Sequence, residues 1–163
     1  MKNKKNLFQN DSAIELPINI VVMLVVGMVA LAALIAIIPP PTKNMSVNID
    51  ESGMKIGGTI SLKSGNTVIV DALTAKNALT LVVKTTVTDP DGNPVRDANV
   101  VLRGLGGVAT NTTDINGEAM LITDTAQVKL GANQNEGTMD LTITANGFYD
   151  YDKTDAVMIV KTK

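Results

Sequence analysis

The residue whose type and position most strongly suggest chemistry is Glu15. It lies in the segment SAIELPINIVVMLVVG, residues 12–27, where an acidic side chain precedes a long apolar run. A carboxylate placed in lipid is costly unless a cation pairs with it or it stays at the level of the headgroups. At that level Glu15 would be a first-turn residue whose negative charge is stabilised by the helix dipole. The residues alone leave both interpretations open.

The rest of the composition excludes several classes of enzyme. The 163 residues include no cysteine and no histidine, so they cannot form a disulfide framework, a thiolate or imidazole zinc site, or a Ser-His-Asp or Cys-His catalytic system. A net charge of −2 and the lack of a basic, aromatic-rich face argue against nucleic acid as a partner. We therefore predict that the protein is not an enzyme and that it has no catalytic residue, cofactor, metal site or small-molecule substrate.

Three segments have the composition of sites but are predicted to be ordinary loops. Asp89–Asn93 (DPDGN) has the acidic residues of a calcium loop, but it lacks the later glutamate and is interrupted by Pro90, which indicates a turn. Asp150 and Asp152 could contribute to a cation site, but we favour solvated loop charges. Arg103–Thr110 lacks the Lys-Ser/Thr ending of a phosphate loop and is predicted to be a flexible tip between strands.

A long apolar segment dominates the N-terminal part of the chain. Leu16–Ile38 contains no charged residue and only one strongly polar residue, Asn19. As a helix rising ~1.5 Å per residue it is roughly 34 Å long, which is enough to cross a hydrocarbon core of about 30 Å. The alternative is a cleaved secretory signal, but the segment exceeds the ~7–15 apolar residues typical of one. We therefore expect a single retained transmembrane helix over residues 14–38.

The flanking residues predict the orientation and the domain boundaries. Residues 1–13 form a basic leader with three lysines among the first five residues, which places the N-terminus in the cytoplasm and the C-terminal domain outside. Residues 39–44 begin with three prolines and are predicted to be a stiff spacer. Residues 45–163 form the extracellular domain. Two glycosylation sequons, at Asn44 and Asn111, lie on that outer side.

The extracellular part has the pattern of an all-β sandwich. Short segments rich in Val, Ile, Leu and Thr are bounded by Gly, Asn and Asp, and no convincing amphipathic helix intervenes. Residues 123–137 are predicted to be a long loop with at most one helical turn. The best-supported part of the sandwich is residues 78–163. The predicted strands lie within residues 45–49, 59–72 (two strands around a turn at 64–66), 78–89, 95–104, 117–124, 138–147 and 155–162.

Part of this region resembles known sandwich families. Residues 87–124 are similar to bacterial immunoglobulin-like domains of the invasin and intimin kind, and equally to carboxypeptidase regulatory-like (transthyretin-like) sandwiches. LTITANGFYD, residues 141–150, resembles the ending of the regulatory-like set. The resemblance implies an immunoglobulin-like or transthyretin-like sandwich, a fold used by spacers, adhesins and pilus subunits alike. The matching residues are Asp89, Gly92, Pro94, Val95, Ala98, Val100, Thr113, Asp114, Gly117 and Ala119.

The segment from residue 11 to residue 27 resembles the N-terminus of type IV prepilin-like proteins, especially archaeal ones with a class III signal peptide. Those proteins carry a short basic leader, a cleavage point and a glutamate at the fifth position after it. Glu15 is the fifth residue counted from Asp11, so the resemblance places the cut between Asn10 and Asp11, with a cut before Gln9 as the alternative. It also implies that Glu15 pairs with the terminal ammonium of a neighbouring subunit, which would make the buried carboxylate tolerable.

These features predict a structural cell-surface protein, namely a type IV pilin-like subunit that forms a homo-oligomer through its N-terminal helix. The alternative is a monomeric membrane-anchored domain that binds another envelope protein, as a stator, an S-layer contact or an adhesin. The expected partners are the membrane and either further copies or another surface protein. The expected location is the cell membrane, in a single pass, or an extracellular filament after processing. Residues 45–62, or the sandwich edges, are expected to pair between subunits by strand addition.

Overall fold

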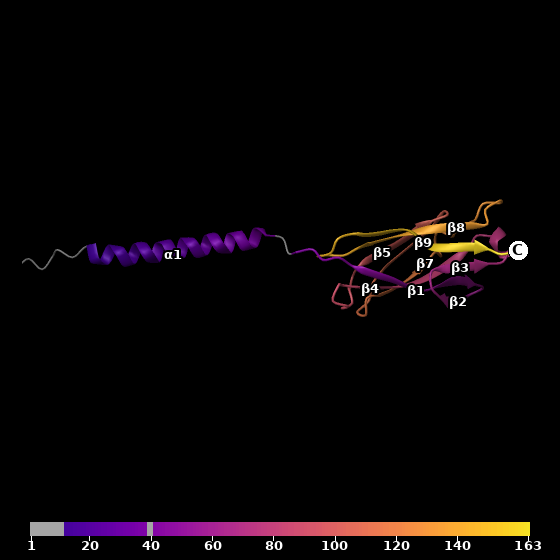
Figure 1. The fold of residues 1–163 in the computed structure, drawn as a ribbon, viewed down its shortest axis with the longest axis horizontal. Coiled ribbons are helices and arrows are strands. Elements are labelled where there is room, and N and C mark those ends of the chain that lie inside the picture. Colours follow the sequence, from indigo (N-terminus) through magenta and orange to yellow (C-terminus); the bar gives the residue numbers. More distant parts are fainter. Residues whose placement is uncertain (1–11, 39–40) are drawn as a thin grey trace, which may run out of the picture. The chain divides into compact units, whose positions relative to one another are not determined.

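The computed structural model describes residues 12–38 and 41–163, which divide into a helical unit up to Pro41 and a β unit from Thr42 to Lys163. The helix, α1, runs from Ser12 to Ile37 (Figure 1). It starts two residues before the predicted span and stops where the sequence turns to proline, because a residue that precedes proline disfavours the helical conformation. The β unit begins at Thr42, within residues 39–44 of the predicted spacer.

The β unit is a sandwich of two sheets. One sheet has the strand order β2-β1-β4-β7 and the other the order β3-β9-β8-β5-β6. A short 3-10 turn, η1 (Thr74–Lys76), connects β3 to β4. An all-β sandwich preceded by a single helix confirms the predicted fold class. The strands are β1 (Ser46–Ile56), β2 (Thr59–Ser64), β3 (Thr67–Val70), β4 (Thr80–Thr88), β5 (Asn99–Gly104), β6 (Gly107–Thr112), β7 (Glu118–Ile122), β8 (Glu136–Thr144) and β9 (Tyr151–Lys161).

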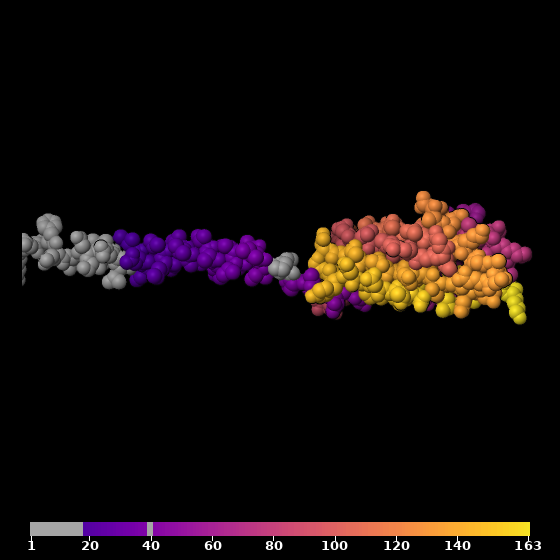
Figure 2. Space-filling model, turned by 90° about the horizontal axis from the view of Figure 1, so that it is seen from above, coloured from indigo at the N-terminus to yellow at the C-terminus, as the bar shows by residue number. Residues whose placement is uncertain are grey.

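Part of the strand order resembles that of an immunoglobulin-like sandwich. β1, β4 and β7 are neighbours in one sheet, and β5, β8 and β9 are neighbours in the other, as strands A, B, E and C, F, G are in immunoglobulin domains. β6 extends the second sheet beyond β5, and β3 pairs in parallel with β9, with Val68 opposite Ile159. Figure 2 shows the outer face of this five-stranded sheet, with the coral residues of β5 and β6 beside the orange and yellow residues of β8 and β9.

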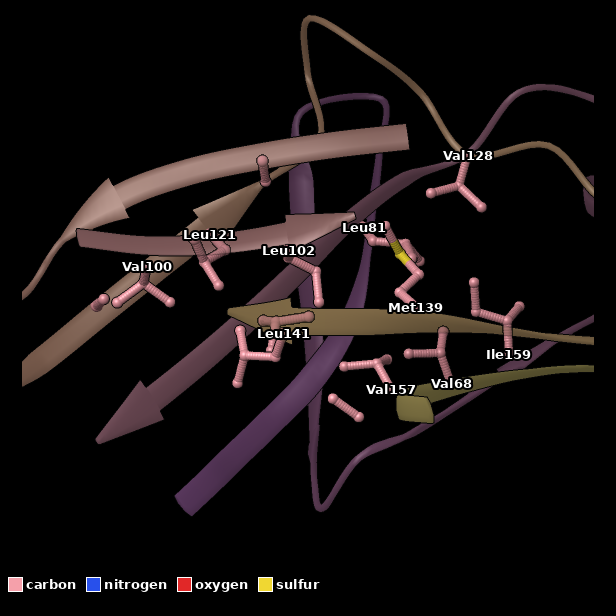
Figure 3. Packing of buried hydrophobic residues seen from close by; sticks show 14 of the residues in the cluster. Val68, Leu81, Val100, Leu102, Leu121, Val128, Met139, Leu141, Val157 and Ile159 are labelled. Atoms are coloured by element: carbon pink, nitrogen blue, oxygen red, sulfur yellow. The ribbon is translucent and has the colours of Figure 1, made fainter. Parts of the chain in front are cut away.

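The core between the sheets is aliphatic. β8 alternates buried and less buried residues, and β4 does so from Val83 to Thr88, because successive side chains of a strand point to opposite faces. Leu102 on β5 lies opposite Leu141 on β8, and both are almost fully buried (Figure 3). Burying one such side chain stabilises the fold by roughly 1.5–3 kcal/mol. Figure 3 also labels Val68, Leu81, Val100, Leu121, Val128, Met139, Val157 and Ile159 from this core.

Several predicted segments differ from the structure. The predicted strand at 45–49 continues to Ile56 as β1, with a bulge at Asp50, so the glycine and charges that follow Ile49 lie within the strand. The strand predicted from Val95 begins only at Asn99, because residue 97 adopts a positive φ of 55° and interrupts the extended chain.

One further segment, the glycine-rich stretch, differs from its prediction. The glycine-rich residues 103–110 are not a flexible tip, because β5 reaches Gly104 and β6 already starts at Gly107. Residues 123–137 are largely a loop, as predicted, although β8 begins at Glu136. That loop contains no helical turn, and the sandwich has its short helical turn at η1 instead.

β1 is paired on both of its edges within its own chain. Gly53 lies opposite Leu62 of β2 and also opposite Val82 of β4, and both pairings are antiparallel. Residues 45–62 therefore pair within the sandwich of their own chain, where β2 is an outer strand, and the expected strand addition between subunits stays a prediction. The outer strands are β2 and β7 in one sheet and β3 and β6 in the other.

Candidate functional site

The first candidate functional element is the apolar surface of α1. Ile18–Ile37 is long and apolar enough to cross a membrane, and the same length and composition also fit a signal sequence. Every side chain from Ile18 to Ile38 is exposed. With about 3.6 residues per turn, the uninterrupted apolar run Ile20–Val26 covers the whole circumference of the helix. A helix that is apolar all round requires lipid or other apolar helices around it.

Glu15 lies in the first turn of α1, which begins at Ser12. Negative charge is stabilised there because the first N–H groups of a helix have no partner within the helix. The side chain of Glu15 lies outside the described residues, and so do Asn10 and Asp11 of the predicted processing site and the alternative at Gln9. The ion pair with a neighbouring subunit and the cleavage both stay predictions.

The second candidate is the place where the chain enters the sandwich, which we call the entry end. The main-chain N–H of Lys43 donates to the carbonyl of Gly147 (3.0 Å), and the carbonyl of Lys43 accepts from the N–H of Tyr149 (2.9 Å). These bonds tie the incoming chain to the loop between β8 and β9. The entry end comprises Lys43 and the loops at 89–98, 113–117 and 145–150.

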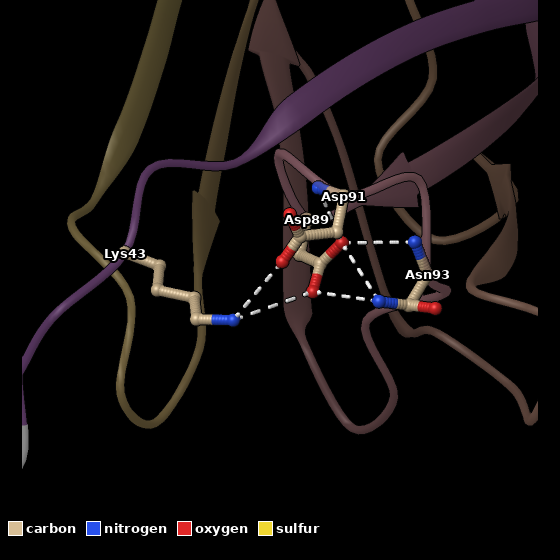
Figure 4. Close-up of polar contacts among 4 residues, drawn as sticks. All are labelled: Lys43, Asp89, Asp91 and Asn93. Carbon is tan, nitrogen blue, oxygen red and sulfur yellow. Dashed lines mark hydrogen bonds and ion pairs between the residues drawn. The ribbon is translucent and has the colours of Figure 1, made fainter.

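The Lys43 side chain crosses to the turn at Asp89–Asn93 (Figure 4). Its ammonium lies 3.4 Å from Oδ2 of Asp91 and 3.7 Å from Oδ2 of Asp89. Oδ1 of Asp89 accepts from the N–H of Asn93 (2.8 Å) and from that of Asp91 (2.9 Å). Hydrogen bonds from Asn93 lower the pKa of Asp89 below its ordinary value, and Asp91 and Lys43 add to the effect. The segment is a turn, as predicted, and Lys43 supplies the cation beside its carboxylates.

The loop from residue 113 to residue 117 also stabilises the entry end, through the buried hydroxyl of Thr113. Oγ1 of Thr113 donates to the carbonyl of Val95 (2.7 Å) and accepts from the N–H of Ala98 (2.9 Å). Thr113 is only 3% exposed. This hydroxyl therefore holds the irregular segment between the 89–93 turn and β5, where the predicted strand is interrupted.

Asp114 and Gly117 close the second turn. Oδ1 of Asp114 accepts from the N–H of Glu118 (2.9 Å) and of Asn116 (2.8 Å), and these bonds lower the pKa of Asp114. Gly117 has a φ of 75°, and a Cβ at this position would lie 2.4 Å from the carbonyl oxygen of Val87. The N–H of Gly117 donates to the carbonyl of Asp114 (3.0 Å), which closes a tight turn around Asn116. The residues that carry the family resemblance thus build two turns at the entry end, and their role is structural.

The two sequons differ in how they present their asparagine. Asn44 is exposed and is followed by Ser46, the exposed first residue of β1. Asn111 lies on β6, where its Nδ2 donates to the carbonyl of Met120 (2.8 Å) and its Oδ1 accepts from the N–H of Thr112 (2.9 Å). The hydroxyl of Thr113, which completes that sequon, is buried. Both asparagines are exposed, and they differ in that the Asn111 amide is engaged in these hydrogen bonds.

The remaining acidic residues do not gather into a metal site. Oδ1 of Asp152 accepts from the hydroxyl of neighbouring Thr142 (2.8 Å), and Asp150 is exposed in the loop before β9. In the described ranges 12–38 and 41–163, no three His, Cys, Asp or Glu residues are grouped so that they could hold a metal ion.

The end of the sandwich opposite Lys43, which we call the far end, has a cleft that the sequence did not indicate. It has a volume of about 450 Å³ and lies between the turn joining β1 to β2 and the segment around η1. Ile56 and Leu73 line it and are 58% and 75% exposed. These two residues are distant in sequence, so no local motif could have predicted that they line the same cleft.

Comparison with models of known protein families and with curated protein sequences finds no match for this chain. The interpretation of function therefore starts from the sequence pattern and from the described structure.

Proposed function

We propose that the chain is a structural cell-surface protein, a type IV pilin-like subunit that assembles through α1 and presents its immunoglobulin-like sandwich outside the cell. The observation that carries the proposal is the surface of the helix, which is apolar on every side from Ile20 to Val26 and is followed by a separately folded β unit. Lipid before assembly and neighbouring copies of the same helix after it would cover such a surface.

Glu15 would fix the register between subunits. Cleavage between Asn10 and Asp11, or before Gln9, would leave one new ammonium group per chain close in sequence to one carboxylate. Between neighbouring helices that are offset along their axes, the two charges can pair away from water. Removing one member of such a pair is strongly destabilising, because the other charge stays buried without a partner.

The entry end suits a subunit whose outer domain is carried by a helix. Two main-chain hydrogen bonds at Lys43 and its ion pairs with Asp89 and Asp91 fix the point at which the chain joins the sandwich. A force applied through the helix would therefore act on the sandwich at Lys43, a residue held by these hydrogen bonds and ion pairs.

The proposal is tested with the Glu15→Gln variant of the full chain, expressed in its native cells and examined at the cell surface. Amine-reactive cross-linking should show a ladder of multimers for the wild type and at least about tenfold less of it for the variant, since breaking one buried ion pair costs several kcal/mol. Glu51→Gln on β1 makes the same charge change on the sandwich and should leave the ladder unchanged. A full ladder for Glu15→Gln would contradict the ion-pair assembly.

A second function is favoured by the far-end cleft. Exposed Ile56 and Leu73 beside a cleft of about 450 Å³ suit a protein partner better than bulk water. In this alternative the chain is a monomeric membrane-anchored domain that binds another envelope protein. Leu73→Asp would then release the partner from the surface complex, whereas Glu15→Gln would have no effect on it.

A further inference from the structure

A pocket lined by three lysines lies at the far end of the sandwich. Its volume is about 450 Å³, which falls within the range of roughly 300–1,000 Å³ for small-molecule sites. Lys76, Lys129 and Lys161 line it together with small and apolar residues that include Ala75 and Leu130. Ala75 and Leu130 are 5% and 4% exposed, so they give the pocket an apolar floor that belongs to the core.

The three lysines come from separate elements that the fold brings together. Lys76 is the last residue of η1, Lys129 lies in the loop before β8, and Lys161 ends β9. Figure 1 shows η1, the orange loop before β8 and the C-terminal end of the chain at the same end of the sandwich. Main-chain hydrogen bonds hold two of these lysines in place. The N–H of Lys129 donates to the carbonyl of Leu105 (3.1 Å), and the N–H of Lys161 donates to the carbonyl of Asn135 (2.7 Å).

The pocket is basic although the chain as a whole carries a net charge of −2. No aspartate or glutamate is among its lining residues, and none of the ion pairs in the described parts of the chain includes these lysines. Asp71, close by in sequence, commits its carboxylate to the N–H groups of Leu73 (3.0 Å) and Thr74 (2.9 Å). The like charges of these lysines repel one another, and an anion placed among them would relieve that repulsion.

We infer that this pocket binds a small multivalent oxyanion bearing phosphate or carboxylate groups. A lysine ammonium is a point charge with three donors, and it pairs with oxygens of either group through charge-assisted hydrogen bonds. The apolar floor formed by Ala75 and Leu130 excludes water from one side and accepts an uncharged part of the ligand. This site is independent of helix assembly, so its test does not depend on the proposed function.

The test is calorimetric titration of the full chain, in a neutral detergent, with pyrophosphate and in parallel with citrate at low salt. One saturable site is expected for at least one of the two anions, and its affinity should fall as sodium chloride screens the charges. Lys161→Glu should weaken that affinity about tenfold or more, because it replaces an attraction with a repulsion inside the pocket. Lys63→Glu, an identical charge change on exposed β2, should alter it less than about twofold, since solvent screens distant surface charges.

Lys76→Glu is the second variant, and because Lys76 is an exposed residue its replacement leaves the core intact. Circular dichroism of each variant checks that the sandwich is folded. The inference is overturned if neither anion gives a saturable site, or if Lys63→Glu weakens binding as much as the pocket variants do. Binding to vesicles of anionic phospholipid without binding to either free anion would also contradict it, because the lysines would then belong to a membrane-facing surface.

Discussion

Asp89 and Asp114 stabilise two neighbouring turns in the same way. Each carboxylate accepts main-chain N–H groups from residues further along its own loop, and each has a pKa below the ordinary value. A carboxyl group whose pKa is lower in the folded than in the unfolded chain stabilises the fold above about pH 4. That stabilisation is lost as the pH falls from there through the lower folded-state pKa.

Replacing Asp89 with alanine should lower the melting temperature of the sandwich by several degrees at neutral pH. The change removes the acceptor for the N–H groups of Asp91 and Asn93 and one partner of Lys43. Asp91→Ala is the matched control: the Asp91 side chain is 70% exposed, and an exposed ion pair contributes little. Thermal melts of the full chain followed by circular dichroism measure both.

The same variant predicts a pH dependence. The difference in melting temperature between wild type and Asp89→Ala should be full near neutral pH. It should shrink as the pH falls below about 4, where the unfolded chain binds the proton first, and on through the lower folded-state pKa. A difference that stays constant through the acid range would show that charge on Asp89 does not stabilise the turn.

The sequons predict unequal modification. When an N-glycosylating cell modifies the folded chain, glycan should be found on exposed Asn44 and little on Asn111, whose amide is hydrogen-bonded to Met120. Glycopeptide mass spectrometry of wild type, Asn44→Gln and Asn111→Gln measures the occupancy. Equal occupancy at the two positions would contradict the prediction.

Among the elements, β5 and β8 form the centre of the five-stranded sheet. Leu102→Ala removes a side chain with no exposed surface and leaves a cavity against Leu141, which should reduce the free energy of unfolding by about 2–5 kcal/mol. Met120→Ala, at a position 42% exposed on β7, should cost less than about 1 kcal/mol. Urea unfolding of the full chain compares the two, and similar losses would mean that the core has been misplaced.

Elements with strong local signals could be predicted from the sequence. β4 and β8 largely alternate apolar and polar residues, β7 is a short apolar segment, and the apolar run of α1 is continuous. β6 was not predicted as a strand, because its glycine and its outward-facing Thr and Asn residues are typical of loops. The continuation of β1 was missed because its neighbours β2 and β4 override weak local propensity.

Sites formed by distant residues were beyond sequence reasoning. The turn at Asp89 was expected. The cation that pairs with it, Lys43, is distant in sequence, because Lys43 precedes β1 whereas Asp89 follows β4. The lysine pocket likewise joins residues from η1, a loop and the last strand, and no spacing along the chain encodes their meeting. A turn can therefore be predicted from its local sequence, whereas the distant residues that contact the turn depend on the topology of the sheets.

Taken as a whole molecule, the chain combines an apolar helical unit with a sandwich that has its own core and its own polar braces. Under the proposed function, such a division would let the helix exchange lipid for helix contacts while the sandwich stays folded. Assembly would then depend on the N-terminal segment, and the proposed cleavage would create a filament subunit from a membrane-anchored chain.

The most direct measurement is the N-terminus of the protein recovered from its native surface, by intact mass and terminal-peptide analysis. The proposed function predicts a chain that starts at Asp11, or at Gln9 for the alternative cut, with the basic leader removed. A chain that starts at Met1 or Lys2 would contradict it, leave Glu15 as a first-turn residue at the headgroup level, and assign the protein to the membrane-anchored binding domains.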